Sequence, residues 1–320
     1  MSDRKGLFNT SAYGGPGWSG RERTHREEIG DLWAPSGIDT EWAPLKSVIM
    51  HRPGAELDIS HNDPDAVQML APLDIGLARA QHDGIAEAYR SNGVEVHYVD
   101  PPAVPTPNQM FCADLFVMTP EGAILARPAS TVRAGEERLI ARRLADMGVP
   151  ILRTLRGTAL FEGADAMWLD PETVMVGMGQ RTNAEAVAQI DEVLIEMGVE
   201  VLPVDMPFGC MHFMGLLRIV DKDLAICWWR RTPHATVRAL EERGYEIVWL
   251  PEGPDLELNR AMNIVTLAPR KILMCAGYDS VQKTYEDAGI ECVTVDCSEL
   301  VKAAGAMGCL TGVVHREAVS

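Results

Sequence analysis

Two hydrophobic patterns alternate along the chain, and their order repeats five times. The first pattern is helical and is found in LARAQHDGIAEAYRSN, GEERLIARRLADM, AEAVAQIDEVLIEM, HATVRALEER and SVQKTYEDA. Each of these stretches is followed by a glycine, namely Gly93, Gly148, Gly198, Gly244 and Gly289. A glycine just past a helical pattern is a C-cap signal, so the sequence predicts five helices that end at these positions.

The second pattern is strand-like and flanks the predicted helices. After the glycines come VEVHYVD, VPILRTL, VEVLPVD, YEIVWLP and IECVTVD, which are alternating or largely apolar. Before most of the helices stand two strand-like pieces joined by a turn, as in DLFVMTPEGAILARP, AMWLDPETVMVGM, GLLRIVDKDLAICWW and NIVTLAPRKILMC. The turn residues Pro-Glu-Gly, Asp-Pro-Glu and Asp-Lys-Asp support this interpretation. The predicted unit is therefore strand, strand, helix, strand.

This unit occurs five times over residues 45–320, with its glycines 55, 50, 46 and 45 residues apart. Repeats of such a period stack in a ring or a solenoid. The sequence thus predicts an α/β fold, a five-unit pseudo-symmetric α/β propeller whose repeated ββαβ units surround a central channel. The alternative is an ordinary α/β domain with coincidental repeats, which five matches in the same order disfavour.

We expect residues 45–320 to form a single catalytic domain and residues 1–44 to form an N-terminal arm. The arm contains GGPGWSGRERTHREEIGDLW, which mixes glycine, charge and two tryptophans without a repeat unit. A partly ordered arm is the favoured interpretation. A lid or an oligomer contact is the alternative, so a homo-oligomer is left open.

Composition and charge narrow the class of protein. The apolar runs are shorter than a membrane span and the start, MSDRKGLFNT, lacks an apolar signal core, so we expect a cytoplasmic protein with no membrane partner. Seven scattered cysteines without a CxxC pair suit a reducing compartment. A formal net charge of −17 argues against nucleic acid as a partner.

Five polar residues in four segments stand out because apolar strand residues surround them. Asp114 lies in QMFCADLFVM, Glu162 and Asp165 in ALFEGADAMWL, His212 in CMHFMGLL, and Cys309 in GAMGCLTGVV. Each lies at the start of a unit's first strand or, for Cys309, in the closing segment. Equivalent strand starts lie near the same end of the channel in a ring of repeats, so we expect these side chains to meet. Taken singly, each is more often a turn, cap or core residue.

Together, these residue types predict a particular chemistry. A cysteine thiolate is a nucleophile, and a nearby cation lowers its pKa. Two carboxylates in one pocket repel each other unless a cation lies between them. A planar guanidinium fits this role, because it donates in-plane N–H groups to carboxylates and leaves its carbon open to attack. A histidine can protonate the leaving amine and then deprotonate water.

Other motifs contribute little. GMGQRTN lacks the third glycine of a dinucleotide-binding loop, and Cys210 and His212 form only a C-x-H pair. There is no Walker loop and no G-x-S-x-G elbow. We therefore expect no cofactor and no metal site.

At these residues the chain resembles the guanidino-group-modifying enzymes, the superfamily of arginine deiminases, dimethylarginine dimethylaminohydrolases and arginine amidinotransferases. PNQMFCADLFV resembles the segment whose Asp binds the guanidinium, which implies Asp114 for that role. FEGADAMWL resembles the E-G-G-D motif and implies Glu162 as a guanidinium ligand, with Asp165 as a supporting carboxylate. MHFMG and GCLTG resemble the segments of the catalytic histidine and the nucleophilic cysteine, which implies His212 and Cys309. The family fold is the five-unit α/β propeller.

The resemblance also implies substrate contacts. VGMGQRTN is similar to the deiminase stretch whose arginine holds the substrate carboxylate, which implies Arg181. Asn108 matches a deiminase position at the substrate's amino-acid end. Two residues depart from the pattern: Ala164 replaces the second glycine of E-G-G-D, and Met214 replaces the Asp of H-x-D. Met214 resembles the dimethylarginine hydrolases and would leave room for an alkylated guanidine nitrogen.

The sequence thus predicts a cysteine-dependent hydrolase of arginine or a substituted arginine-like guanidine, acting through a covalent thiouronium intermediate. The first alternative is an amidinotransferase, in which an acceptor amine replaces water. The second is a non-catalytic binding protein of the same fold, which the complete Asp–Glu–His–Cys set and the acidic chain disfavour.

Overall fold

Five three-stranded sheets form the body of the protein, as described by a computed structural model that covers residues 8–61, 63–253, 255–256 and 261–319. The sheets have the strand orders β15-β1-β2, β3-β4-β5, β6-β7-β8, β9-β10-β11 and β12-β13-β14. The predicted five-unit α/β propeller is therefore confirmed. The strands are β1 (Leu45–Met50), β2 (Glu95–Tyr98), β3 (Phe116–Thr119), β4 (Gly122–Leu125), β5 (Ile151–Thr154), β6 (Ala166–Asp170), β7 (Thr173–Met178), β8 (Glu200–Asp205), β9 (Leu217–Asp221), β10 (Leu224–Trp228), β11 (Glu246–Leu250), β12 (Val265–Ala268), β13 (Lys271–Cys275), β14 (Glu291–Val295) and β15 (Gly312–Arg316).

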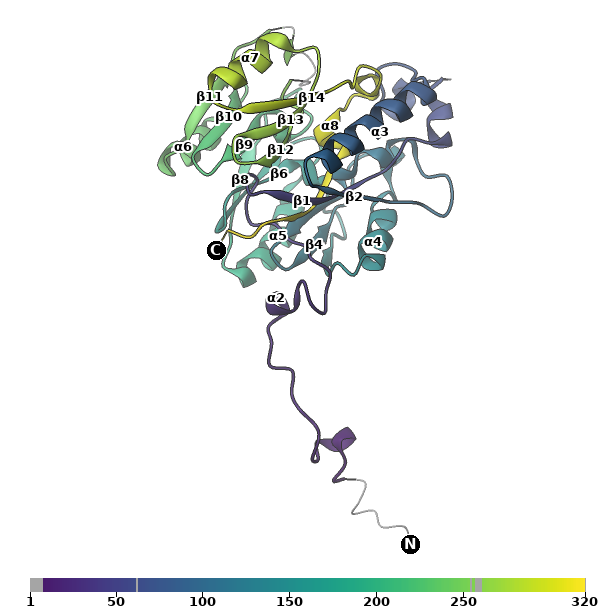
Figure 1. Ribbon diagram of the computed structural model, residues 1–320, viewed down its shortest axis with the longest axis vertical. Helices are drawn as coiled ribbons and strands as arrows, with labels where there is room; N and C mark the ends of the chain where they lie inside the picture. The colour runs from purple at the N-terminus through teal and green to yellow at the C-terminus, as the bar shows by residue number, and fades with distance from the viewer. Residues whose placement is uncertain (1–7, 62, 254, 257–260, 320) are drawn as a thin grey trace.

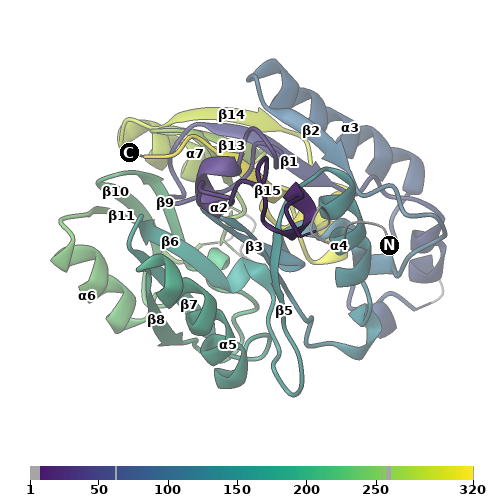
Figure 2. The same cartoon turned by 90° about the horizontal axis from the view of Figure 1, so that it is seen from below.

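One long helix belongs to each sheet and lies on the outside of the ring (Figure 2). In every unit the first two strands are antiparallel, the second and third are parallel, and the helix connects the parallel pair. A parallel pair needs such a crossover, because a tight turn cannot join parallel strands. The helices are α3 (Ile75–Ser91), α4 (Glu137–Asp146), α5 (Ala184–Leu194), α6 (His234–Glu242) and α7 (Asp279–Asp287).

The five glycines that follow the helices all have left-handed backbone conformations, with φ between 75° and 80° at Gly93, Gly148, Gly198, Gly244 and Gly289. Side chains disfavour this conformation, whereas glycine adopts it readily. The predicted C-caps are confirmed, and they set the point at which each chain segment turns back into its sheet.

The ring is closed by the end of the chain. β15 pairs antiparallel with β1 and supplies the first strand of a unit whose other strands lie near the start of the chain. Figure 1 shows this yellow strand beside the dark-blue β1. The sequence shows no strand pair before α3, and the structure gives the reason: the missing strand comes from the other terminus.

The segment before β1 has two different parts. Residues 8–24 extend away from the ring in Figure 1 and include a short 3-10 helix, Ser11–Tyr13. After the short helix α2 (His25–Glu28), the chain returns to the ring, where Gly37 N donates to Val314 O over 2.9 Å and Trp168 N donates to Glu41 Oε1 over 3.1 Å. The predicted arm thus ends in a segment that packs on the propeller. Among the described residues, no helix combines the length and apolarity that crossing a membrane requires.

Candidate active site

Four short segments lie just before the first strands of their units, and each contains or directly follows a predicted polar residue. They are Cys112–Asp114 (η5), Gly163–Asp165 (η7), Phe213–Gly215 (η9) and Met307–Leu310 (α8). Segment η5 contacts both η7 and α8, and η7 contacts η9. The repeat therefore brings together residues that are far apart in sequence. One small pocket results, lined by Gln68, Asn108, Phe111, Asp114, Arg133, Arg181, Met211, His212, Ala303, Ala304, Gly305 and Cys309.

The two predicted guanidinium ligands lie side by side with the histidine. His212 Nε2 is 2.6 Å from Glu162 Oε2, and His212 Nδ1 is 3.9 Å from Asp114 Oδ1. All three side chains are at least 95% buried. Asp114 Oδ1 is buried and accepts no hydrogen bond from any described residue. An unpaired buried carboxylate oxygen is costly, so this atom is suited to receive a donor from a bound ligand.

The charges in this group reinforce one another. Burial alone would lower the pKa of His212, but the carboxylates of Asp114 and Glu162 raise it to about 9. Burial alone would likewise raise the pKa of Glu162, yet the hydrogen bond from His212 and the positive charges of His212, Arg133 and Arg181 hold it well below its usual range. The site therefore contains an imidazolium and a carboxylate at neutral pH.

Cys309 lies in α8 with its sulfur held by an asparagine. Asn263 Nδ2 donates to Cys309 Sγ over 3.1 Å, and Cys309 N donates to Asn263 Oδ1 over 3.2 Å. Burial raises the pKa of the Cys309 thiol and the charge of Asp114 adds to this, whereas Asn263, the Ala306 backbone and Arg218 lower it. The flanking Gly308 leaves no room for a side chain, because a Cβ there would lie 2.7 Å from Arg218 Nη2.

A buried arginine, Arg133, also belongs to the site. Its Nη1 donates to Asp114 Oδ2 over 2.6 Å and to Glu162 Oε2 over 3.3 Å, and its Nε donates to Glu136 Oε2 over 2.9 Å. Burial would lower the pKa of Arg133, but Glu136 and the two site carboxylates raise it instead. Arg133 thus compensates the carboxylates and still leaves Asp114 Oδ1 open.

The remaining predicted residues occupy different places. Asn108 and Arg181 line the pocket; Asn108 Nδ2 donates to Val67 O over 2.9 Å, and Arg181 Nη1 donates to Glu162 over 3.1 Å. Asp165 does not line the pocket. Its carboxylate accepts hydrogen bonds from Thr182 Oγ1 over 2.6 Å and from Phe213 N over 2.8 Å. Burial raises the pKa of Asp165 to about 6. By fixing the backbone next to His212, Asp165 supports the imidazole.

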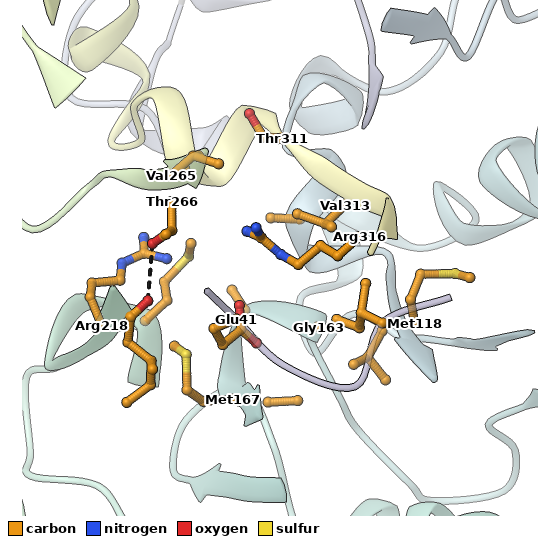
Figure 3. Close-up of a pocket in the computed structure, with 18 of the residues that line it drawn as sticks. Glu41, Met118, Gly163, Met167, Arg218, Val265, Thr266, Thr311, Val313 and Arg316 are labelled. Carbon is orange, nitrogen blue, oxygen red and sulfur yellow. Dashed lines mark hydrogen bonds between the residues drawn. The ribbon is translucent and has the colours of Figure 1, made fainter. Parts of the chain in front are cut away.

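Met214 lies outside the candidate pocket. It is 7% exposed and lines a cavity of about 90 Å³ in the central channel. Figure 3 shows this cavity, with Gly163, Arg218, Thr311 and Arg316 around it. The backbones of η7 and α8 separate the cavity from the pocket, since Gly163 and Gly308 also line it. Met214 thus lines the channel cavity and does not line the candidate pocket.

Asn263 and Arg133 are site residues that the sequence analysis did not single out. Asn263 lies just before β12 in AMNIVTL, so it follows the same rule as Asp114, Glu162 and His212, a polar residue at the start of a first strand. The same rule, applied to the unit that begins with β12, identifies Asn263. Arg133 ends a 3-10 turn, Thr131–Arg133, in a loop, and no pattern in the sequence marks it.

The acidic side of the site has the composition of a cation-binding site. Asp114, Glu162 and His212 each offer a ligand atom within 4.8 Å of the others, a spacing that also suits a metal ion. Their partners are organic cations, however: Arg133 and Arg181 donate to the carboxylates, and the imidazole is charged. The carboxylates of this site thus already accept hydrogen bonds from guanidinium groups, which is the contact that a guanidine ligand would make.

A five-unit α/β propeller with a cysteine, a histidine and two carboxylates at the starts of its first strands is characteristic of the guanidino-group-modifying enzymes, and the chain is a member of this class. Residues 73–316, more than half of the chain, match the sequence model of the eukaryotic N,N-dimethylarginine dimethylhydrolases, and the chain belongs to this family.

Individual relatives agree with this assignment. The chain is 27% identical to an N(G),N(G)-dimethylarginine dimethylaminohydrolase of Streptomyces coelicolor over 84% of its own length and 96% of the relative's. In structure it resembles a mutant of the Pseudomonas aeruginosa dimethylarginine dimethylaminohydrolase complexed with citrulline, with a TM-score of 0.71 and 22% identity over 86% of this chain and all of that one. It also resembles SxtG, an amidinotransferase from Microseira wollei, with a TM-score of 0.72 and 15% identity over 89% and 98% of the two chains.

Proposed function

We propose that the protein is a cysteine-dependent hydrolase that acts on the guanidinium group of arginine or a substituted arginine, through a covalent thiouronium intermediate on Cys309. The observation that carries the proposal is the meeting of Cys309 and His212 in one buried pocket with an unpaired carboxylate oxygen of Asp114. Such an oxygen attracts a cation that donates hydrogen bonds, and a guanidinium is one that a thiolate can attack.

The proposed reaction has two halves. In the first, Cys309 Sγ bonds to the guanidinium carbon and His212, charged at neutral pH, gives its proton to the departing nitrogen, so that the C–N bond breaks and the amine leaves. In the second, neutral His212 takes one proton from water, the oxygen adds to the same carbon, the C–S bond breaks, and the remaining hydroxyl proton passes to solvent as the ureido C=O bond forms. The products are an amine and a ureido compound, and the thiolate and imidazolium are restored.

The other site residues have proposed positioning roles. Asp114 and Glu162 hold the guanidinium between them, opposite the sulfur. Arg181 and Asn108 lie in the same pocket and bind the amino-acid end of the substrate, with Arg181 moving from Glu162 to the substrate carboxylate. Asp165 keeps the His212 segment in place through Phe213.

Substrate preference is a further part of the proposal. Deiminases have an aspartate at the position of Met214, and here Met214 lines the channel cavity and not the pocket. Because the pocket thus lacks one charged acceptor for a free terminal nitrogen, we expect guanidines with a substituted terminal nitrogen to be used at least as well as arginine. The relation to dimethylarginine dimethylaminohydrolases supports this preference.

An amidinotransferase is the second candidate, because a structural neighbour, SxtG, is one. It would share the first half-reaction and differ in the acceptor of the amidino group. The direct test is a panel of arginine, methylarginines and guanidino acids, each with and without an acceptor amine, with products identified by mass spectrometry. A ureido product formed without an acceptor amine supports the hydrolase, and a transferred amidino group supports the alternative.

Replacing the nucleophile checks the mechanism in the same panel. We expect Cys309→Ser to lower turnover by at least about a thousandfold, because a serine hydroxyl is far less acidic than a thiol. A chelator should leave wild-type turnover unchanged, since neither half-reaction uses a metal. Buried Cys112→Ser, on η5 but outside the pocket, is the matched control and should retain activity. Turnover by Cys309→Ser near the wild-type rate would rule out the covalent route.

A further inference from the structure

A buried arginine lies behind the segment that carries Cys309. Arg218, on β9, donates from Nε to Met262 O over 3.0 Å, and its buried Nη2 has no hydrogen-bond partner among the described residues. This Nη2 touches Gly308, where an added Cβ would lie only 2.7 Å from it. The unpaired N–H group is therefore in contact with the residue that precedes Cys309.

The channel around Arg218 has more positive than negative charge. Arg218 and Arg316 line the cavity of about 90 Å³, and in Figure 3 their guanidinium groups point into it with Glu41 between them. No ion pair within 4.0 Å joins Glu41 to either arginine; instead, Glu41 accepts from Trp168 N and Arg316 Nη1 donates to Ala43 O. Two guanidinium groups thus face one carboxylate in a buried space.

Such an imbalance favours a further negative charge in the cavity wall, because an uncompensated buried charge is strongly unfavourable. Burial lowers the pKa of Arg218, and Cys309 is the foremost group that opposes this effect, ahead of Glu41. A negative charge on Cys309 would therefore offset part of the cost of burying Arg218. The attraction is mutual, since a group that stabilises the guanidinium is stabilised by it.

Asn263 acts on the same sulfur from a second direction. It donates to Cys309 Sγ and accepts from Cys309 N, so two hydrogen bonds fix the sulfur relative to its own backbone. A Cβ at Gly308 would also lie 2.9 Å from Asn263 Oδ1. The glycine therefore permits both Asn263 and Arg218 to approach the nucleophile segment.

The charged groups on the pocket side of Cys309 differ from those in the channel. The charged groups that line the pocket with it are Asp114, Arg133, Arg181 and His212. Of these, Asp114 acts to raise the pKa of the thiol, in addition to burial. The side-chain groups that lower the pKa of the thiol are Asn263 and Arg218, neither of which lines the pocket.

We propose that Asn263 and Arg218 are positioning residues for Cys309: Asn263 donates one hydrogen bond to the sulfur and accepts one from the backbone N–H of Cys309, and Arg218 stabilises the thiolate from the channel side of α8. This role rests on the proposed function only in making Cys309 the nucleophile. In the free protein the thiol proton passes to solvent, and no other reactant is needed.

The test is the pH dependence of Cys309 alkylation by iodoacetamide without substrate, followed by mass spectrometry of the peptide that contains residue 309. We expect Arg218→Gln to raise the thiol's pKa by about one unit, so that alkylation at pH 8 slows about tenfold. Arg218→Lys keeps the charge and should restore most of the wild-type rate. Arg316→Gln removes the other channel cation, which is not among the groups named as lowering the pKa of Cys309, and should shift the profile of Cys309 by much less than Arg218→Gln does.

Asn263→Asp provides a second, independent variant of nearly the same shape, and its carboxylate should slow alkylation at pH 8 by tenfold or more. Thermal unfolding of each variant identifies any that does not fold. The alkylation profiles of the folded variants then decide the proposal. An unshifted profile in folded Arg218→Gln or Asn263→Asp, or an equal shift in Arg316→Gln, would overturn it. Because no substrate is involved, absence of guanidine turnover would refute the proposed function and leave this result standing.

Discussion

The imidazole of His212 is surrounded by negative charge. Glu162 Oε2 lies 2.6 Å from one ring nitrogen and Asp114 Oδ1 lies 3.9 Å from the other. Burial acts in the opposite direction, yet the carboxylates prevail and raise the pKa of His212 to about 9. The folded protein therefore binds a proton that the unfolded chain releases near pH 6.5.

This difference makes stability depend on pH. The contribution of a raised pKa is complete below pH 6.5 and is lost as the pH rises to about 9. We expect the wild type to be more stable than His212→Gln at pH 6.5, and the difference to shrink by on the order of 3 kcal/mol by pH 9.5. Urea unfolding across this range measures it.

A matched control is His315→Gln on β15. Burial lowers the pKa of His315, so its imidazole is neutral in both folded and unfolded protein above pH 6.5. The difference between wild type and His315→Gln should therefore be constant from pH 7.5 to 9.5. A constant difference for His212→Gln as well would mean that the carboxylates do not hold its proton.

At the scale of elements, the sequence predicts what lies within one repeat and which equivalent positions of the repeats meet, and it misses contacts between repeats that occur only once. The helices, their glycine caps and the paired strands of the second to fifth units are local patterns, because hydrophobic period and turn residues act over a few neighbours. The partner of β1 is not local, since β15 comes from the other terminus. Arg133 escapes prediction for a similar reason: its loop has no period, and only the folded ring brings it to Asp114.

The loop that lines the pocket after η11 (Leu300–Ala303) is another contact between repeats. Ala304 has a left-handed backbone with φ of 68°, and Gly305 follows with its Cα against the ring of Phe111. That ring lies 5.8 Å from the guanidinium carbon of Arg133. The loop, the ring and Arg133 therefore form one packed wall of the pocket.

We expect Gly305→Ala to damage this wall. The added Cβ would lie 2.3 Å from Phe111 Cε1, so the ring must move, at a cost of about 1–3 kcal/mol of stability. Displacement of Phe111 shifts Arg133 and, through it, Asp114, so kcat/KM should fall about tenfold or more. Gly253→Ala, where nothing lies within 4 Å of the added Cβ, is the control. Equal stability and turnover in both variants would show that Phe111 does not support the site.

At the scale of the whole molecule, the ring depends on the strand that closes it. β15 pairs with β1, contacts β3 of the next unit and buries Val314, which is 1% exposed. It also follows α8 directly, so the position of Cys309 depends on the same strand. Closure thus holds the last site residue against the first units of the chain.

Removal of residues 312–320 should therefore open the ring. Loss of the β1 pairing and of buried Val314, itself contributing about 1.5–3 kcal/mol, is a large fraction of the 5–15 kcal/mol typical of folded proteins. We expect the truncated protein to lose its cooperative thermal transition and its turnover together. Removal of residues 1–20 is the control, because residues 8–20 extend away from the ring and the capped helix α2 is kept. A sharp transition in the protein without β15, at the temperature of the control, would mean that the other four sheets hold the ring closed without it.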